Sequence, residues 1–354
     1  MSKAYLVLEN GKVFEGQSFG FEGEVTAEVV FTTGMTGYLE TLTDKNYFGQ
    51  IVVQTFPSIG NYGVIKSDFE SEDISLSGYI VKEWCQVPSN FRSEGELDTF
   101  LKERKIVGLC GIDTRTLTKT LRENGVMNGA IVSDPAHADL AQIKGFKADN
   151  ATAAVSVKEK REGKGGKYKV ALMDYGFKKD LYEALEQRGA QVTLCPYNTT
   201  AGEIKAMGAE GILLSNGPGD PAADETVIGN VKEMLELQIP IFGVGLGHEL
   251  LALANGFQTE KLKYGHRGAN QPVKDTETGR VYITGQNHGY AVVSSSVDAA
   301  RAKESFINVN DRTNEGLKYL DRPWFSVQFY PEKSGSTMDT LWLFDDFFHS
   351  IDKK

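Results

Sequence analysis

One corner of the sequence combines residue types and spacing suited to covalent chemistry. The apolar run 241–244 is typical of a buried strand, and helical spacing begins at Leu246 and continues to Ala254. A sharp strand–turn–helix corner of this kind is typical of a nucleophile elbow, which exposes its apex side chain in front of a helix N-terminus. The apex here is Gly245, and glycine has no side chain with which to attack a substrate.

A rival interpretation of the same corner is a dinucleotide-binding fingerprint, G-x-G-x-x-G. Gly243 and Gly245 fit its first two positions, but His248 stands where the third glycine belongs. The fingerprint also needs an acidic residue about 20 residues further on, and none stands there. We therefore disfavour a dinucleotide site.

A second loop, residues 215–221, places Gly217 and Gly219 on either side of Pro218. Such a tight turn can direct backbone N–H groups towards an anion. The same residues also suit a plain connecting turn, and this segment alone does not decide between the two interpretations.

The elements that must position these loops alternate between strand and helix in the second half of the chain. This alternation predicts a parallel sheet covered by helices on both faces. Ligands of such sheets bind at the carboxyl ends of the strands, which is where both loops fall. Strands are expected at 170–173, 191–194, 211–214 and 239–244, with helices ending at Arg188 and spanning 202–207, 225–237 and 246–254.

The first half is predominantly β with helical insertions. Asn10-Gly11 separates two apolar runs, 4–8 and 12–14, and this dipeptide predicts a hairpin turn because both residues tolerate positive φ. Further strands are expected at 28–31 and 50–53, and helices at 96–105 and 114–124, the second capped by Asp113.

A change in composition suggests where the two halves separate. Residues 157–167 are almost wholly charged or glycine, which favours a solvated linker over a helix. We therefore predict an amino-terminal domain over 1–150, a linker over 151–168 and a second domain over 169–354.

Composition excludes several classes of function. The 354 residues include 38 Lys and Arg against 48 Asp and Glu, a net charge of −10 that disfavours nucleic-acid binding. Three widely spaced cysteines form neither a disulfide framework nor a metal knot, so we expect a reducing, cytoplasmic location. The start lacks a signal-peptide pattern, and no apolar run approaches the ~20 residues of a membrane span.

The elbow carries a family resemblance. Residues 243–254, GVGLGHELLALA, resemble the G-x-C-L-G-H-Q motif of class I glutamine amidotransferases. Together with residues 215–221, 285–292 and 325–332, they resemble the small (glutaminase) subunit family of carbamoyl phosphate synthetases. Motifs of the first half agree with that family: residues 35–38, 42–44, 57–61, 111–115 and 128–129.

The resemblance implies an α/β fold: an amino-terminal α+β domain, then an amidotransferase-like domain with a mostly parallel sheet flanked by helices. It also implies a Cys–His–Glu triad that hydrolyses glutamine. In this sequence Gly245 occupies the cysteine position and Tyr330 the histidine position, and only Glu332 remains. A tyrosine is a poor base at neutral pH because its ordinary pKa is about 10. We therefore expect glutaminase activity to be absent or very low.

The resemblance also assigns glutamine-contacting positions, and two of them, Gly217 and Leu246, would supply the backbone oxyanion hole. Glu249 replaces the glutamine of the motif and lies in the first helical turn, where a carboxylate would oppose an oxyanion. We expect weak glutamine binding without cleavage. The matching positions are Gly217, Gly219, Leu246, Asn287 and Gly289, and the departing ones are Asn46, Glu249 and Tyr290.

The partner implied by the resemblance is the large subunit, which binds ATP, Mg²⁺ and bicarbonate and makes carbamoyl phosphate for pyrimidines and arginine. We expect no cofactor in this chain, and a structural or regulatory role in a complex that uses free ammonia. One alternative is a freestanding, non-catalytic glutamine-binding or sensor paralogue. The least favoured alternative is an intact glutaminase with an unseen nucleophile.

The remaining polar candidates are expected to be structural. His248 suits a hydrogen-bonding role on the elbow helix, and His288 suits loop packing. His266 and His349 have no partner at metal-ligand spacing, so no metal site is predicted. Ser215 and Ser334 are poor replacement nucleophiles because neither lies at the elbow. Tyr330 is expected to bond to the Glu332 carboxylate or to pack in the core.

Overall fold

The computed structural model describes residues 2–331 and 338–353, and the chain divides into two compact units, Met1–Asp149 and Asn150–Lys354. Each unit has its own hydrophobic core. No helix within the described ranges is long and apolar enough to cross a membrane.

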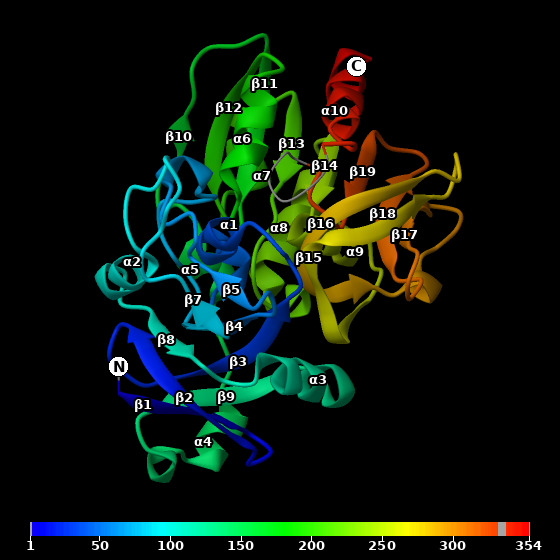
Figure 1. Ribbon diagram of the computed structural model, residues 1–354. Coiled ribbons are helices and arrows are strands. Elements are labelled where there is room, and N and C mark those ends of the chain that lie inside the picture. Colours follow the sequence, from blue (N-terminus) through cyan, green and yellow to red (C-terminus); the bar gives the residue numbers. More distant parts are fainter. Residues whose placement is uncertain (1, 332–337, 354) are drawn as a thin grey trace. The chain divides into compact units, whose positions relative to one another are not determined.

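The first unit is built on a closed barrel with the strand order β1-β2-β8-β6-β4-β3-β9 (Figure 1). The hairpin predicted at Asn10-Gly11 is confirmed: β1 and β2 pair in antiparallel fashion, and Gly11 has a φ of 81°. β1 also pairs with β9, which closes the barrel. The strands are Lys3–Leu8 (β1), Val13–Gly20 (β2), Val25–Thr32 (β3), Gln50–Gln54 (β4), Gly78–Ile80 (β6), Val107–Cys110 (β8) and Met127–Val132 (β9).

Short helices and one two-stranded ribbon complete this unit. The two predicted helices are confirmed as α2 and α3, and the Asp113 carboxylate caps α3 by accepting from the Thr116 N–H at 2.9 Å. The helices are Tyr38–Thr43 (α1), Leu97–Glu103 (α2), Thr114–Asn124 (α3) and Leu140–Gly145 (α4), with 3₁₀ turns at Lys45–Tyr47 (η1), Lys66–Asp68 (η2) and Pro135–His137 (η3), and the ribbon pairs Ser58–Ile59 (β5) with Glu83–Trp84 (β7).

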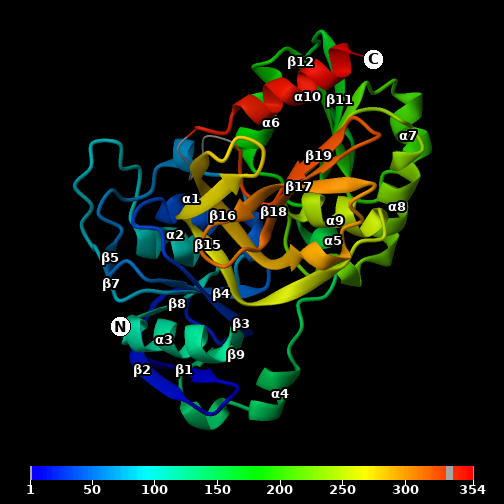
Figure 2. The same ribbon diagram turned by 90° about the vertical axis from the view of Figure 1, so that its right-hand side faces the viewer.

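The second unit is built on a ten-stranded sheet with the order β10-β12-β11-β13-β14-β19-β18-β17-β15-β16 (Figure 2). From β12 to β19 the neighbours are parallel, and the predicted α/β class is confirmed. The strands are Arg161–Glu162 (β10), Tyr168–Asp174 (β11), Ala190–Pro196 (β12), Gly211–Leu214 (β13), Ile241–Val244 (β14), Thr259–Asp275 (β15), Val281–Val292 (β16), Ala302–Asn308 (β17), Asn314–Tyr319 (β18) and Trp324–Val327 (β19).

The sheet is mixed, not mostly parallel, because β18, β17, β15 and β16 continue it in antiparallel fashion. The sequence analysis did not anticipate this half. The longest strand, β15, is rich in lysine, glycine and other polar residues and lacks the apolar run that marks the parallel strands. Register shifts between Lys261 and His266, and between Gly268 and Gln271, further interrupt its alternation.

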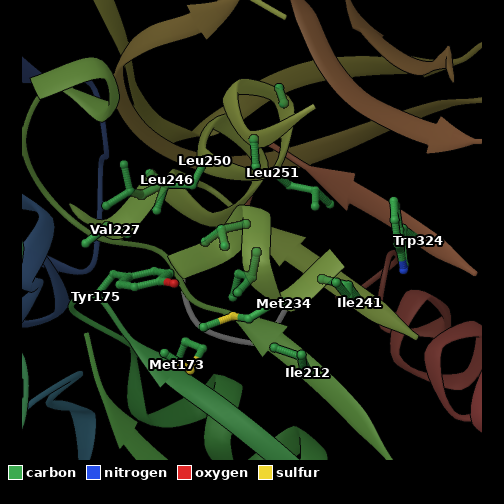
Figure 3. Packing of buried hydrophobic residues seen from close by; sticks show 14 of the residues in the cluster. Met173, Tyr175, Ile212, Val227, Met234, Ile241, Leu246, Leu250, Leu251 and Trp324 are labelled. Carbon is green, nitrogen blue, oxygen red and sulfur yellow. The ribbon is translucent and has the colours of Figure 1, made fainter. Parts of the chain in front are cut away.

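Helices cover both faces of the parallel half, as the alternating pattern predicts. Along β13, Ile212 and Leu214 face one apolar cluster and Leu213 faces the other, because successive side chains of a strand point to opposite faces. Figure 3 shows the first cluster, in which Leu250 and Leu251 lie on the covering helix. The helices are Lys179–Glu186 (α6) and Trp342–Asp352 (α10) on one face, and Ala201–Ala206 (α7), Glu225–Leu235 (α8) and Leu246–Ala254 (α9) on the other.

The segment 151–168, predicted as a linker, lies within the second unit and carries regular structure. It contains the short helix Ala151–Val155 (α5) and the edge strand β10, which pairs with β12. Arg161 and Glu162 of β10 are exposed, in keeping with the charged composition of this stretch.

Candidate functional site

The elbow is formed at the carboxyl end of β14. Gly245 has φ 57° and ψ −116°, and α9 begins at the next residue. Its N–H donates to the Val327 carbonyl at 2.9 Å, and its own carbonyl accepts from the N–H of His248 at 3.0 Å. The sharp corner is therefore held by backbone bonds on both sides, although no side chain stands at its apex.

The elbow backbone leaves room for a small side chain. A Cβ at Gly245 would lie 3.2 Å from the Cβ of Asn216 and 3.9 Å from the Gln328 carbonyl oxygen. Accommodating a Cβ would thus require Asn216 to shift by a few tenths of an ångström. The apex also keeps the positive φ that side chains other than glycine adopt only at some cost.

The two backbone groups assigned to an oxyanion hole lie on segments that meet. A Cβ at Gly217 would come within 2.8 Å of the Leu246 side chain and 2.3 Å of the Tyr175 carbonyl oxygen. Within the described residues, neither the Gly217 N–H nor the Leu246 N–H has a hydrogen-bond acceptor. Among the residues that the structure describes, no acceptor therefore competes for these two donors.

The histidine position of the triad is filled by a core aromatic residue. Tyr330 is 4% exposed and packs in an apolar cluster with Phe329 and Phe344. Its N–H donates to the Gly285 carbonyl at 2.9 Å, and the Nζ of Lys178 lies 4.1 Å from its ring centroid. The core packing expected for Tyr330 is therefore present. Glu332, the remaining triad position, lies outside the described residues, as does Ser334.

Glu249 is buried near the elbow, with 3% of its surface exposed. Burial raises the pKa of its carboxyl group to about 8, while the nearby Gln328 amide partly opposes this rise. Glu249 is therefore mostly neutral at pH 7, which corrects the charged carboxylate assumed from the sequence. A neutral carboxyl group presents one donor and one acceptor, much as the side-chain amide of glutamine does.

Two further polar residues near the elbow have structural hydrogen bonds. The Nδ1 of His248 lies 2.8 Å from the Ser326 hydroxyl, and burial lowers the pKa of this histidine to about 3. Ser215 donates to the Asn216 carbonyl at 2.8 Å and accepts from the Tyr175 N–H at 3.0 Å. These contacts fit the structural roles expected for both residues.

No cysteine replaces the missing nucleophile at the elbow. Cys195 lies on β12, which β11 and β13 separate from β14. Burial raises the pKa of its thiol to about 11, so it is protonated at neutral pH. Cys85 and Cys110 belong to the first unit.

The other assigned glutamine contacts fall on two units. Asn287, Gly289 and Tyr290 lie on β16, which packs against α9, and Asn287 is buried. Gly219 follows β13 and has a φ of 98°. Asn46 belongs to η1 of the first unit, where its N–H donates to the Asp44 carboxylate at 2.9 Å.

The sequence analysis missed a buried cluster in the antiparallel half. His266 of β15 lies 3.3 Å from the Glu315 carboxylate of β18 and 2.8 Å from that of Asp311. Its Nδ1 also lies 3.2 Å from the Nε2 of His288, which is on a strand rather than in a loop. His266 has no partner at metal-ligand spacing in the sequence, but the fold brings these three groups to it in space. The three residues of the cluster, His266, His288 and Glu315, lie on β15, β16 and β18, so no short motif in the sequence contains them.

The strand–glycine–helix corner on a mixed sheet defines the second unit as a class I glutamine amidotransferase domain. The family description "Glutamine amidotransferase class-I" matches residues 171–350, and "Carbamoyl-phosphate synthase small chain, CPSase domain" matches residues 6–131. The chain belongs to the family of carbamoyl phosphate synthase small chains.

Similarity to individual members extends over nearly the whole chain. The carbamoyl phosphate synthase small chain of Clostridium perfringens (strain 13 / Type A) is 46% identical over 98% of this chain and 98% of that protein. That of Bacillus anthracis is 46% identical over 99% of this chain and 96% of its own length. That of Listeria monocytogenes serotype 4b is 45% identical over 100% and 98%, respectively.

Proposed function

We propose that this chain is a small subunit of carbamoyl phosphate synthase that has lost glutamine hydrolysis. In this proposal it stabilises or regulates a large subunit that consumes free ammonia. The observation that carries the proposal is Gly245 at the apex of a fully formed elbow. Membership in the family supports a complex with a large subunit. Glycine at the position of the nucleophile supports the loss of glutamine hydrolysis.

Hydrolysis of a side-chain amide needs a nucleophile to attack the carbonyl carbon and a base to accept the proton of that nucleophile. Gly245 cannot attack, and Tyr330 is enclosed in an apolar cluster beside the Lys178 ammonium group. Loss of the nucleophile alone costs on the order of 10⁶ in turnover in a well-studied triad enzyme. We therefore expect glutamine cleavage at the level of the uncatalysed background.

Weak glutamine binding is a separate part of the proposal. The N–H groups of Gly217 and Leu246 have no acceptor among the described residues, and Asn287 and Gly289 match the family at β16. Glu249, neutral at pH 7, keeps the size and one donor of the glutamine that it replaces. These features support retention of a ligand pocket without the chemistry.

The partner in this proposal is the large subunit, which would bind ATP, Mg²⁺ and bicarbonate and form carbamoyl phosphate for pyrimidine and arginine synthesis in the cytoplasm. The present chain would then hold neither nucleotide nor catalytic metal. Its contribution would be to the stability or the regulation of the large subunit.

Co-expression with a candidate large subunit tests the proposal. We expect the two chains to co-purify, and the complex to form carbamoyl phosphate from ammonia but not from glutamine. The large subunit purified without the present chain provides the control. Glutamine-driven synthesis above that control would overturn the loss of function, and failure of the two chains to co-purify would favour the freestanding sensor.

A further inference from the structure

The buried cluster on the antiparallel half of the sheet has the dimensions of a metal site. The Nδ1 of His266 lies 3.2 Å from the Nε2 of His288 and 3.3 Å from the Oε1 of Glu315, and the last two atoms are 4.0 Å apart. A tetrahedral zinc ion with bonds of about 2.0–2.1 Å places its ligands about 3.3 Å from one another. All three residues are buried, with Glu315 fully enclosed.

The outer nitrogen of each histidine is already committed as a donor. The Nδ1 of His288 lies 2.6 Å from the Tyr290 carbonyl oxygen, and the Nε2 of His266 lies 2.8 Å from the Asp311 carboxylate. Carbonyl and carboxylate oxygens only accept, so both outer nitrogens carry hydrogen. In neutral imidazoles the inner nitrogens then present lone pairs to the space between the strands, as metal-ligating histidines do.

A fourth acceptor faces the same space. The Oε1 of Gln286 lies 3.1 Å from the Nε2 of His288, while the amide Nε2 of Gln286 donates to the second oxygen of Glu315 at 3.0 Å. Exchanging the oxygen and nitrogen positions of the Gln286 amide would place its oxygen next to the Glu315 carboxylate, and two acceptors would then face each other. If His266 carried a proton on both ring nitrogens, its Nδ1–H could donate to only one neighbour in this space. The Nε2 of His288 and the Oε1 of Gln286 would then still face each other as two acceptors without a hydrogen between them.

We propose that His266, His288 and Glu315 bind a structural Zn²⁺ ion, with Gln286 placed to supply the fourth ligand. Imidazole and carboxylate together suit zinc better than magnesium, which prefers oxygen ligands alone. The carboxylates of Glu315 and Asp311 would offset the two positive charges of the ion, and the buried Arg267 adds one further positive charge beside His288. Asn308 and Thr313 donate to the Glu315 oxygen at 3.4 and 3.2 Å and thereby orient it.

Such an ion would join β18 to the hairpin formed by β15 and β16. His288 stands between Asn287 and Gly289, the two β16 positions assigned to glutamine contacts. Zinc binding would therefore fix the strand that presents those positions. This inference does not depend on the proposed loss of glutaminase activity.

Metal analysis of the full-length protein tests the site. Protein purified without chelator, or stripped and reloaded with zinc alone, is expected to hold one zinc per chain and to unfold at a higher temperature than the stripped form. Magnesium alone should give no such shift. A zinc content near zero after reloading would overturn the site and favour a metal-free network in which Glu315 is protonated and the Gln286 amide is turned.

Three variants and a matched control sharpen the test. His288→Asn and Glu315→Gln should each lower zinc affinity by on the order of 100-fold or more. Asp311→Asn, which removes the carboxylate that supports His266 and accepts from Thr313, should lower it by about 10- to 100-fold. The control is His137→Asn, since His137 pairs with Glu24 at 3.0 Å on the exposed surface and, among the described residues, belongs to no group of three histidine, cysteine or carboxylate side chains. Circular dichroism of each stripped variant verifies folding. Equal zinc affinity in wild type and both ligand variants would overturn the assignment.

Discussion

Two groups of buried polar residues in the second unit differ in what they preserve. The elbow at the end of the parallel half has a sharp backbone corner, and Gly245 and Tyr330 stand at the positions to which the family resemblance assigns the reactive side chains. The cluster in the antiparallel half consists of the reactive side chains of His266, His288 and Glu315, held close together. The comparison shows that packing maintains the shape of the elbow with glycine at its apex.

The packing that maintains the elbow can be identified. A Cβ at Gly247 of α9 would lie 2.1 Å from the Leu214 carbonyl oxygen of β13, and a Cβ at Gly243 would lie 2.6 Å from the Gly247 carbonyl oxygen. The helix therefore approaches the sheet at a distance that only glycine permits. This close approach fixes the corner whatever residue stands at its apex.

The largest expected effect comes from restoring the lost groups. In the double variant Gly245→Cys/Tyr330→His, we expect glutamate release to rise at least 100-fold above background, because a nucleophile and a base contribute several orders of magnitude together. The cysteine would occupy the apex at a φ of 57°, and Asn216 would shift by a few tenths of an ångström because it lies 3.2 Å from the new Cβ. Steady-state glutamate release measures the gain.

The matched control for this experiment is Gly245→Ala/Tyr330→His, which fills the same space without a nucleophile. Each single substitution should remain at background, because the two groups act as a unit. Equal glutamate release by the cysteine and alanine double variants would show that introducing a nucleophile and a base is not sufficient for hydrolysis at this elbow.

The second effect concerns the ionisation of Glu249. Its pKa is about 8 in the folded protein and about 4.3 when unfolded, so the folded state binds the extra proton between these values. Stability should therefore fall as pH rises through this window, by up to about 1.4 kcal/mol per pH unit. Glu249→Gln removes this dependence.

Urea unfolding of wild type and Glu249→Gln at pH 5 and pH 8 measures the difference. Relative to the variant, the wild type should lose stability at the higher pH. An unchanged difference between the two proteins at both pH values would mean that Glu249 is ionised at the elbow.

The third effect concerns the close packing of α9 against β13 at Gly247. Gly247→Ala should destabilise the second unit by about 2–3 kcal/mol, because the new methyl group would overlap the backbone of β13. The melting temperature of the variant should fall accordingly. A neutral result would contradict the claim that close packing of α9 maintains the elbow.

The smallest effect provides the comparison for the third. Gly229 also lies within a helix, α8, but a Cβ there has no atom within 4 Å. Gly229→Ala should stabilise the protein by about 0.5–1 kcal/mol, since alanine loses less backbone freedom on folding. Thermal unfolding measures the melting temperatures of Gly247→Ala and Gly229→Ala. A lower melting temperature for Gly229→Ala than for the wild type would show that the effect at Gly247 is not specific to its close packing.

The sequence predicted the parallel half of the sheet closely. The expected bounds 211–214 and 246–254 coincide with β13 and α9, because long apolar runs and regular helical spacing signal elements buried on both sides. The antiparallel half was not predicted, because β15 is polar and contains bulges. Its strands pair mainly with neighbours in the chain, β15 with β16 and β17 with β18, but the polar composition and bulges of β15 hide the alternation that marks a strand.

The same distinction applies to the site. The substitutions proposed at Gly245 and Tyr330 could be read from the sequence because the motifs of the family resemblance are contiguous there. The neutral state of Glu249 could not, because it arises from burial that only the packed structure supplies. The contacts of His266 with Glu315 and Asp311 could not either, since the bulges of β15 set which residues face one another.

Glutamate release at saturating glutamine, measured with the wild-type complex and in parallel without protein, tests whether this chain hydrolyses glutamine. We expect the same background rate in both, alongside carbamoyl phosphate formation from ammonia by the complex. Glutamate release reproducibly above the protein-free rate would contradict the loss of glutaminase activity.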